Sequence, residues 1–212
     1  MVIKTKIIKI NPTNPSLKIL KKVAKEIRKG KIVVYPTETC YGLATNALNE
    51  TSVKKIYETK ERPIESNLTV IDDSLETAKK YGEINKIAEK LVKKFMPGPL
   101  TLVVRRKRIF PQITNKDFAF RISSNLVASK LAFYSKVPIT ATSANLHRKP
   151  SIYSSIKVIK IFNGKVDLIL DAGNLKRRKP STIVDIKDGK IKIVRKGPIS
   201  TKEIISFLKK KL

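Results

Sequence analysis

Residues 31–43 read KIVVYPTETCYGL, an apolar run followed at once by hydroxyls, a carboxylate and a cysteine. The apolar part predicts a short strand over 31–35. Pro36 fixes φ and removes one backbone donor, whereas Gly42 permits conformations that are costly for other residues, so we expect a shaped loop between them. This loop is a candidate binding loop. An ordinary strand-to-helix connection is the alternative, because hydroxyl-rich turns are common.

Strands and helices are expected to alternate along the rest of the chain. Apolar spacing, caps and breakers predict helices over 17–28, 50–60, 74–81, 84–95, 125–134 and from 201. Short apolar runs predict strands over 1–10, 68–71, 100–104, 118–122, 139–142, 168–170, 182–186 and 190–194, with a hairpin turn at Asp188-Gly189. Interleaved elements with a hairpin predict an α/β fold whose sheet is mixed rather than wholly parallel.

Length and composition are those of a soluble globular protein. The 212 residues suit one core and contain no linker-like stretch, so we expect a single domain over 1–212. Hydrophobic residues make up 41% and charged residues 30%, as in globular proteins. No apolar run approaches the roughly 18 residues that span a bilayer, and the first ten residues do not form a signal peptide. We therefore expect a cytoplasmic protein without a membrane partner.

Two residue types that occur once limit the possible chemistry. Cys40 is the single cysteine, which excludes an intrachain disulfide and a paired-cysteine metal motif. His147 is the single histidine, which excludes two-histidine zinc motifs and leaves any catalytic triad dependent on one basic loop residue. Neither a phosphate-binding P-loop nor a dinucleotide fingerprint occurs. We therefore expect other side chains to carry the chemistry, with no protein-held metal.

The charge balance predicts a polyanionic partner. The chain has 46 lysines and arginines against 17 acids, a formal net charge of +29. Self-repulsion of this size destabilises a compact state unless polyanions or counterions offset it, so nucleic acid or polyphosphate binding is implied. The basic clusters lie at 105–108, 176–179 and 209–211, and each alone could be a solvated loop or tail. A lysine-biased composition is the alternative.

Four short stretches could bind an anion or nucleotide. Lys60 and Arg62 lie two residues apart where a helix ends, and an exposed, extended exit would point both toward a polyphosphate. Residues 142–145, TSAN, offer hydroxyls and an amide as a cradle for an anion or a ribose. Residues 180–182 and 195–197 add hydroxyls and a cation at strand ends. Each stretch alone is ordinary, and a solvated helix end is the alternative for the first.

Together and in this order, the motifs resemble those of the YrdC-like threonylcarbamoyl-adenylate synthase family. The resemblance runs from about residue 16 to 199. It is carried by YPTETxYGL at 35–43, KxRP at 60–63, PGPLT at 97–101, Arg121, SAN at 143–145, PS at 150–151, PST at 180–182 and RxG at 195–197. The family is identified from several motifs at once, not from any single one.

The resemblance implies an open α/β fold with a twisted mixed sheet and flanking helices around a concave basic cavity. It also implies a nucleotidyltransferase that converts L-threonine, bicarbonate and ATP into threonylcarbamoyl-adenylate and pyrophosphate. The product would pass to a transferase complex that makes threonylcarbamoyladenosine beside the anticodon of certain tRNAs. Binding of tRNA or double-stranded RNA is a further association of the family.

Carried over by motif, the resemblance assigns two sets of residues. The ATP set is Lys60, Arg62, Ser66, Ser143, Asn145, Ser151 and Arg195, with Lys60 and Arg62 as the catalytic pair on the phosphates. The threonine set is Thr37, Thr39, Arg121, the backbone of Ala141, and Ser181. Attack of a carbamate oxygen on the α-phosphorus needs positioning and charge neutralisation more than an acid or base, which fits a histidine-poor site. Magnesium is expected on the triphosphate, held mainly by phosphates and water.

Several residues depart from the family pattern. Ile71 stands where many members have a histidine that would contact threonine, and Arg148 stands where glycine is usual. Asn67 and Thr69 match the related YciO branch, whose activity is less clear. The alternative function is therefore an RNA-binding protein of the same fold with weak or different adenylating activity.

Overall fold

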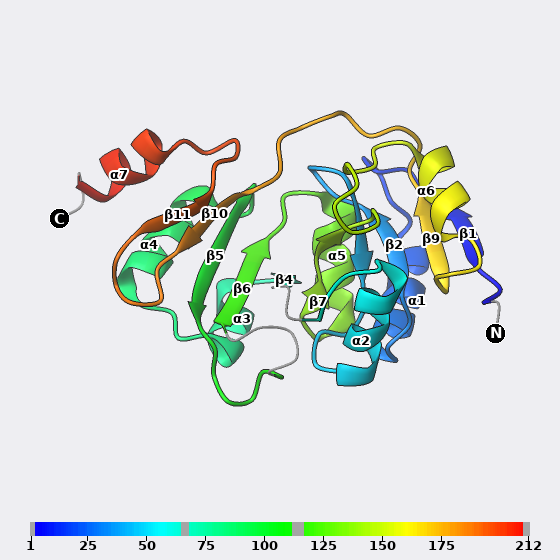
Figure 1. Cartoon of the computed structure of the whole chain (residues 1–212), viewed down its shortest axis with the longest axis horizontal. Coiled ribbons are helices and arrows are strands. Elements are labelled where there is room, and N and C mark those ends of the chain that lie inside the picture. The colour runs from blue at the N-terminus through cyan, green and yellow to red at the C-terminus, as the bar shows by residue number, and fades with distance from the viewer. Residues whose placement is uncertain (1–2, 65–67, 112–116, 210–212) are drawn as a thin grey trace.

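The computed structural model describes residues 3–64, 68–111 and 117–209, which form two groups of elements side by side (Figure 1). The helices in these ranges are α1 Leu17–Arg28, α2 Glu50–Thr59, α3 Leu75–Tyr81, α4 Lys86–Phe95, α5 Leu126–Ser135, α6 Ser155–Phe162 and α7 Thr201–Lys209. The strands are β1 Lys6–Lys9, β2 Val33–Pro36, β3 Tyr41–Ala44, β4 Thr69–Asp72, β5 Leu100–Arg105, β6 Asp117–Ile122, β7 Ile139–Thr140, β8 Thr142–Ser143, β9 Leu168–Asp171, β10 Thr182–Asp185 and β11 Lys192–Arg195.

The first sheet contains residues 33–44, which include the predicted binding loop. Its order is β1-β9-β2-β3-β8, with β1, β9 and β2 parallel and β3 antiparallel to both β2 and β8. Residues 37–40 form the turn of the β2–β3 hairpin, so the alternative of a strand-to-helix connection is wrong. Gly42 is needed for space rather than for an unusual φ, because an added Cβ would lie 3.1 Å from the Tyr35 ring.

The second sheet has the order β11-β10-β5-β6-β4-β7. The pairs β10/β5 and β4/β6 are parallel, and β10/β11, β5/β6 and β4/β7 are antiparallel. The β10–β11 pair confirms the hairpin predicted at Asp188-Gly189, where Gly189 has a φ of 73°. The predicted mixed α/β fold is confirmed, with its strands divided between two mixed sheets.

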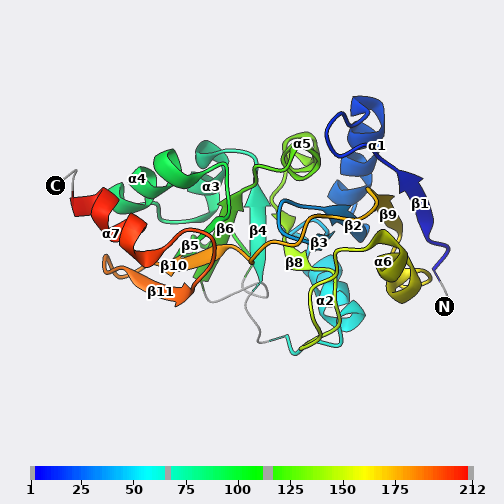
Figure 2. The same cartoon turned by 90° about the horizontal axis from the view of Figure 1, so that it is seen from above.

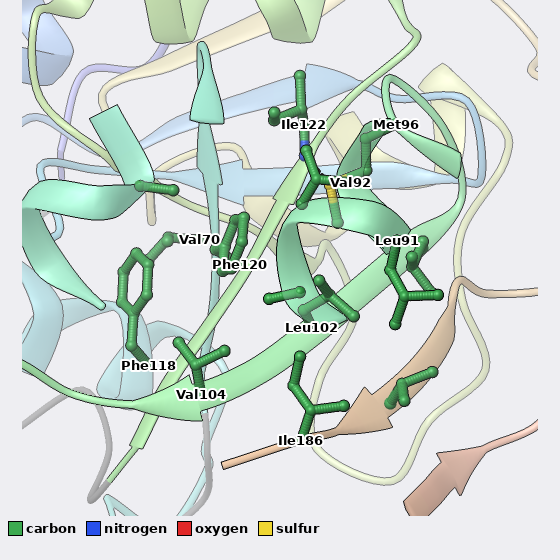
Figure 3. Packing of buried hydrophobic residues seen from close by; sticks show 14 of the residues in the cluster. Val70, Leu91, Val92, Met96, Leu102, Val104, Phe118, Phe120, Ile122 and Ile186 are labelled. Carbon is green, nitrogen blue, oxygen red and sulfur yellow. Dashed lines mark hydrogen bonds between the residues drawn. The ribbon is translucent and has the colours of Figure 1, made fainter. Parts of the chain in front are cut away.

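Alternating side chains of β2 face two separate cores. Val33 and Tyr35 pack in the core beneath α1 and α5, whereas Val34 faces the core formed with α2 and α6. A third core lies against the second sheet, where Phe118 and Phe120 stack with ring centroids 5.3 Å apart (Figure 3). The first sheet is therefore covered on both faces, which explains why β2 is an apolar run without polar alternation.

The two sheets are joined where the chain passes directly from β7 to β8. Ile139–Thr140 pairs with β4 in the second sheet, and Thr142–Ser143 pairs with β3 in the first. Ala141 lies between them and donates its N–H to the carbonyl of Thr69. The segment from β9 to β10 also crosses between the sheets, as the orange connection in Figure 1 shows. The predicted strand over 139–142 is therefore two short strands, one in each sheet.

Most helix starts follow recognisable caps. The side chains of Asn49, Ser74, Asn85 and Asn125 each accept a hydrogen bond from the N–H three residues ahead. Helix α6 was not predicted by the sequence patterns. It has 8 residues, and its Ser154 makes no side-chain capping bond, so neither length nor cap marks it.

Candidate active site

A cavity of about 270 Å³ lies where the two sheets meet. The β2–β3 turn and β8 of the first sheet line it together with residues of β4, β5, β6, β10 and β11 of the second. The lining residues are Tyr35, Thr37, Thr39, Cys40, Gly42, Arg62, Thr69, Thr101, Arg121, Ala141, Thr142, Ser143, Ser151, Pro180, Ser181, Ile183 and Arg195. Hydroxyls and guanidinium groups are prominent in this lining, which suits a polar, negatively charged ligand.

Thr37 shapes the turn between β2 and β3. Its hydroxyl donates to the carbonyl of Cys40 at 2.7 Å and accepts from the N–H groups of Thr39 and Cys40 at 3.1 and 3.2 Å. The Thr39 hydroxyl lies 3.0 Å from that of Thr37. Because these bonds occupy the Thr37 hydroxyl, Thr39 has more hydrogen-bonding capacity left for a ligand. Burial raises the pKa of the Cys40 thiol, which keeps it protonated and unsuited as a nucleophile.

Three arginines line the cavity, and each is held by a different partner. Arg62 Nη1 donates to the hydroxyl of Thr142 at 3.2 Å. Arg195 donates from Nε to the Ser181 carbonyl and from Nη2 to the Ser181 hydroxyl, both at 3.0 Å. Arg121 Nη1 lies 3.1 Å from the Glu38 carboxylate. Burial lowers the pKa of Arg62 and of Arg195, so an anion entering the cavity would stabilise the charged form of both side chains.

Lys60 is buried, which contradicts the prediction of an exposed helix exit. Its side chain is 2% exposed. The ammonium donates to the carbonyl of Ser143, to the carbonyl of Asn145 at 2.6 Å and to Asn145 Oδ1 at 3.5 Å. Burial and the nearby charge of Arg62 lower the pKa of Lys60 to about 7. The residue therefore joins the end of α2 to the loop after β8.

The Ser143–Asn145 loop is fixed by its own hydrogen bonds as well. The Ser143 hydroxyl donates to Asn145 Oδ1, and Asn145 Nδ2 donates to the carbonyl of Leu146 at 3.0 Å. The N–H of His147 donates to the carbonyl of Lys60 at 2.8 Å. This loop is consequently rigid before a ligand binds, which reduces the ordering cost of binding.

The opposite wall depends on a close approach of two backbones. Ser181 shares a 2.8 Å hydrogen bond with the hydroxyl of Thr101. A Cβ added to Gly197 would lie 2.4 Å from the N of Thr182 and 2.5 Å from the carbonyl of Pro180. Glycine at 197 therefore allows the segment after β11 to lie against the start of β10, which places Arg195 on Ser181.

Comparison with known proteins identifies the family. A family model described as telomere recombination, covering Sua5, YciO and YrdC proteins, matches residues 25–197. The chain belongs to the Sua5/YciO/YrdC family. A putative threonylcarbamoyl-AMP synthase of Methanocaldococcus jannaschii is 39% identical over 207 residues, which is 96% of this chain and 99% of that protein.

Solved structures of two branches of the family have the same fold. The structure of Sua5 from Pyrococcus abyssi, complexed with L-threonine, is 36% identical with a TM-score of 0.90. The match covers 95% of this chain but 60% of the Sua5 chain, so this chain spans less than two thirds of that one. YciO of Escherichia coli is 25% identical with a TM-score of 0.83, over 95% of this chain and 99% of that one.

Most residues assigned by family resemblance come together in the cavity. Those that line it are Thr37, Thr39, Arg62, Arg121, Ala141, Ser143, Ser151, Ser181 and Arg195. Lys60 and Asn145 lie behind this wall and contact Ser143. A neighbouring pocket of about 600 Å³ is lined by both Asn145 and Ser151. Because Ser151 lines the cavity as well, the two spaces adjoin there. Ser66 lies outside the described residues.

The sequence did not reveal the role or the surroundings of several residues at the site. Thr101 lay inside a motif that was recognised but was assigned no role, and Thr142 was named only as part of the cradle at 142–145 and not among the ATP or threonine residues. Glu38 was part of the quoted loop, yet nothing local shows that it pairs with Arg121. Ile71, the residue in place of the usual histidine, lies in the apolar core beneath α1 and α5.

In residues 3–64, 68–111 and 117–209, no helix is long and apolar enough to cross a membrane. The same ranges hold no group of three or more histidine, cysteine, aspartate or glutamate side chains arranged to bind a metal ion.

Proposed function

We propose that this chain is a threonylcarbamoyl-AMP synthase, a cytoplasmic nucleotidyltransferase. It joins L-threonine, bicarbonate and ATP into threonylcarbamoyl-adenylate and releases water, as the carbamate forms, and pyrophosphate. The observation that carries this proposal is that a single cavity is lined both by Arg121 and Thr39 and by Arg62 and Ser143. Such a lining can bind a small carboxylate and a polyphosphate together. The name of the M. jannaschii relative supports the same activity, and the L-threonine complex of P. abyssi Sua5 supports threonine as a substrate.

The amino acid occupies the part of the cavity beside the β2–β3 turn. Arg121 binds its carboxylate through a guanidinium edge, because a planar fork matches a carboxylate better than a point charge does. Thr39 and Ser181 provide hydroxyls for its amine and for the carbamate formed on it. The Ala141 N–H is already donated to Thr69, so Ala141 contacts the substrate through its carbonyl.

The nucleotide extends from this cavity into the neighbouring pocket. The cavity of about 270 Å³ lies below the roughly 300–1,000 Å³ of common ligand pockets, so it is small for threonine and ATP together. The pocket of about 600 Å³ shares Ser151 with it and is also lined by Asn145, Ile152 and Arg177. We place the adenosine there and the phosphates against Arg62, Ser143 and Arg195.

The chemistry follows from this placement. A carbamate oxygen attacks the α-phosphorus of ATP, the new oxygen–phosphorus bond forms, and the bond to pyrophosphate breaks. The carbamate is already an anion, so no side chain must remove a proton in this step. Arg62 and Arg195 neutralise charge on the phosphoryl oxygens. Magnesium bound to the triphosphate supplies further charge compensation, which fits described residues that offer no acidic cage of their own.

Lys60 supports the phosphate site from behind the cavity wall. Its bonds hold the Ser143 and Asn145 carbonyls together, which keeps the Ser143 hydroxyl at the wall. A phosphate nearby would raise the lowered pKa of Lys60 and so favour its ammonium form. Catalysis therefore depends on Lys60, which positions the wall, as well as on Arg62, which contacts the phosphates.

Binding of tRNA or double-stranded RNA is the second candidate function, as in a YciO-like protein. The formal charge of +29 and the exposed basic stretch 176–179 favour it. The two functions are compatible, because the product is passed on to a complex that modifies tRNA. Steep loss of RNA affinity with added salt is expected, and a flat salt response would contradict binding through basic side chains.

The synthase activity is tested by pyrophosphate release. The full chain is incubated with ATP, magnesium and bicarbonate, with and without L-threonine, and pyrophosphate release is measured. The mass of the nucleotide product is determined by mass spectrometry. We expect threonine to accelerate release and a threonylcarbamoyl-adenylate mass to appear. Release that is equally fast without threonine contradicts the proposal. Arg62→Met should abolish the threonine-dependent part, while Arg108→Met, at an exposed arginine outside the cavity, should leave it unchanged.

A further inference from the structure

Glu38 is a buried acid whose role neither the family motif nor the proposed chemistry explains. It lies in the turn between β2 and β3, and its side chain is 7% exposed. One carboxylate oxygen lies 3.1 Å from Arg121 Nη1, and the other accepts from the Ser123 hydroxyl at 2.5 Å. Arg121 belongs to β6, so the contact joins the first sheet to the second. In Figure 2 the turn between β2 and β3 reaches toward β4, the neighbour of β6.

The contact positions the Arg121 guanidinium beside the β2–β3 turn through an ion pair. Arg121 is itself 7% exposed, and its Nε is buried without a hydrogen-bond partner among the described residues. Glu38 Oε1 is likewise buried without a hydrogen-bond partner among the described residues, so the pair is held by charge, which draws Nη1 toward the β2–β3 turn and leaves Nε without an acceptor. A buried donor without an acceptor is costly, so the cavity is built for a ligand that supplies one.

The contact also divides the positive charge of the cavity. Arg121, Arg62 and Arg195 all line it, and a polyphosphate would be attracted to any of them. Glu38 neutralises Arg121, whereas Arg195 is held by the neutral carbonyl and hydroxyl of Ser181. A polyphosphate beside Arg121 is repelled by Glu38 more strongly than a carboxylate with its single charge is, and more strongly than a polyphosphate beside Arg195. The positive charge of the cavity is therefore weaker at Arg121 than at its other arginines.

We propose that Glu38 is a positioning residue that orients Arg121 for the substrate carboxylate and keeps phosphate groups away from that arginine. This inference rests on the proposed function for the identity of the carboxylate. The charge of Glu38 thereby keeps the threonine carboxylate at Arg121 and the ATP phosphates at the other two arginines of the cavity. Glu38 acts through Arg121 and does not itself line the described cavity.

The test compares Glu38→Gln with Glu50→Gln. Glutamine keeps the size of Glu38 and can still accept from Ser123, but it lacks the charge. Glu50 lies exposed at the start of α2 outside the cavity, so its variant removes the same charge without touching the site. We expect Glu38→Gln to raise the KM for threonine by about tenfold or more, with the KM for ATP changed by less than about threefold. Glu50→Gln should change neither.

The decisive readout is the behaviour of pyrophosphate as an inhibitor. With the wild-type chain we expect pyrophosphate to compete with ATP and not with threonine. In Glu38→Gln, Arg121 becomes free to bind phosphate, so pyrophosphate should also compete with threonine. A merely structural role for Glu38 would lower kcat or thermal stability without changing the inhibition pattern. An unchanged threonine KM, or competition with ATP alone in the variant, overturns the inference.

Pyrophosphate binding measured by calorimetry keeps this inference separate from the synthase activity. It needs no turnover, and Glu38→Gln should bind pyrophosphate more tightly, by about fivefold to tenfold, or at an additional site. If the wild-type chain shows no threonine-dependent reaction but the variant gains pyrophosphate affinity, the proposed function fails and the charge division stands. If the reaction occurs but pyrophosphate affinity is equal in both proteins, the charge division fails alone.

Discussion

Two buried cations at the candidate site are held in opposite ways. Arg121 lies 3.1 Å from the carboxylate of Glu38. Lys60 instead donates to the carbonyls of Ser143 and Asn145, and it forms no ion pair with an acid in the described part of the chain. Burial lowers the pKa of Lys60 to about 7. An acid partner thus fixes a buried cation before any ligand arrives, whereas carbonyl groups leave the charge to be stabilised by the ligand.

Arg121→Met should have the largest effect, because it leaves the Glu38 carboxylate buried and unpaired. We expect a loss of about 3–5 kcal/mol in the free energy of unfolding, measured with urea, and loss of threonine-dependent pyrophosphate release. The double variant Glu38→Gln/Arg121→Met should recover most of the stability but none of the activity. A single variant as stable as the wild-type chain would show that the ion pair is not effectively buried.

Lys60→Met should have a smaller effect, because it removes donors from two carbonyls without stranding a charge. We expect a loss of about 1–3 kcal/mol at pH 9. The folded-state pKa of Lys60 is lowered, so the unfolded state binds more protons above pH 7 and the wild-type chain gains stability as pH rises from about 7 toward 10. The cost of the substitution should therefore grow over that range. A pH-independent cost would contradict the lowered pKa.

Asp72→Asn extends the comparison to a buried acid without any hydrogen-bond partner in the described ranges. Asp72 is 1% exposed, both of its carboxylate oxygens are unpartnered, and burial raises its pKa to about 8. The folded state therefore binds more protons than the unfolded state between about pH 4 and 8, so the wild-type chain loses stability as pH rises through that window.

Urea midpoints at pH 5 and pH 8 measure this effect. We expect the wild-type chain to lose on the order of 1–2 kcal/mol more than Asp72→Asn between the two pH values. Equal losses in both proteins would mean that Asp72 ionises in the folded state as it does in the unfolded state.

Thr142→Val should have the smallest effect. It keeps the shape of a buried side chain and removes the acceptor of the 3.2 Å bond from Arg62. We expect the KM for ATP to rise by about twofold to fivefold, equivalent to about 0.5–1 kcal/mol, with the KM for threonine unchanged. A larger effect on threonine than on ATP would place the two substrates the other way round in the cavity.

Local patterns were sufficient for part of the fold and much of the site. The β2 strand, the hairpin at Asp188-Gly189 and the capped helices were predicted, because their signals lie within a few residues. The hydroxyls and arginines of the cavity were found through family motifs. The division of the strands between two sheets was not predicted, because it depends on a crossing at Ala141 that no local signal marks.

The environment of each site residue was harder to predict than its identity. Lys60 stands at a helix end that looked exposed, but the carbonyls that bury it come from the loop after β8, 83 and 85 positions away. Arg121 is likewise 83 positions from Glu38. Sequence spacing predicts neighbours along one element, whereas these contacts arise only when the two sheets pack together.

Isotope exchange between ATP and labelled pyrophosphate tests the proposed division of the cavity most directly. The exchange requires that a carbamate of threonine attack the α-phosphorus reversibly while both substrates occupy their own ends. We predict exchange when threonine and bicarbonate are both present, and little when either is omitted. Exchange that proceeds equally without threonine, or that is absent under all of these conditions, would contradict a cavity that holds an amino acid beside the phosphates.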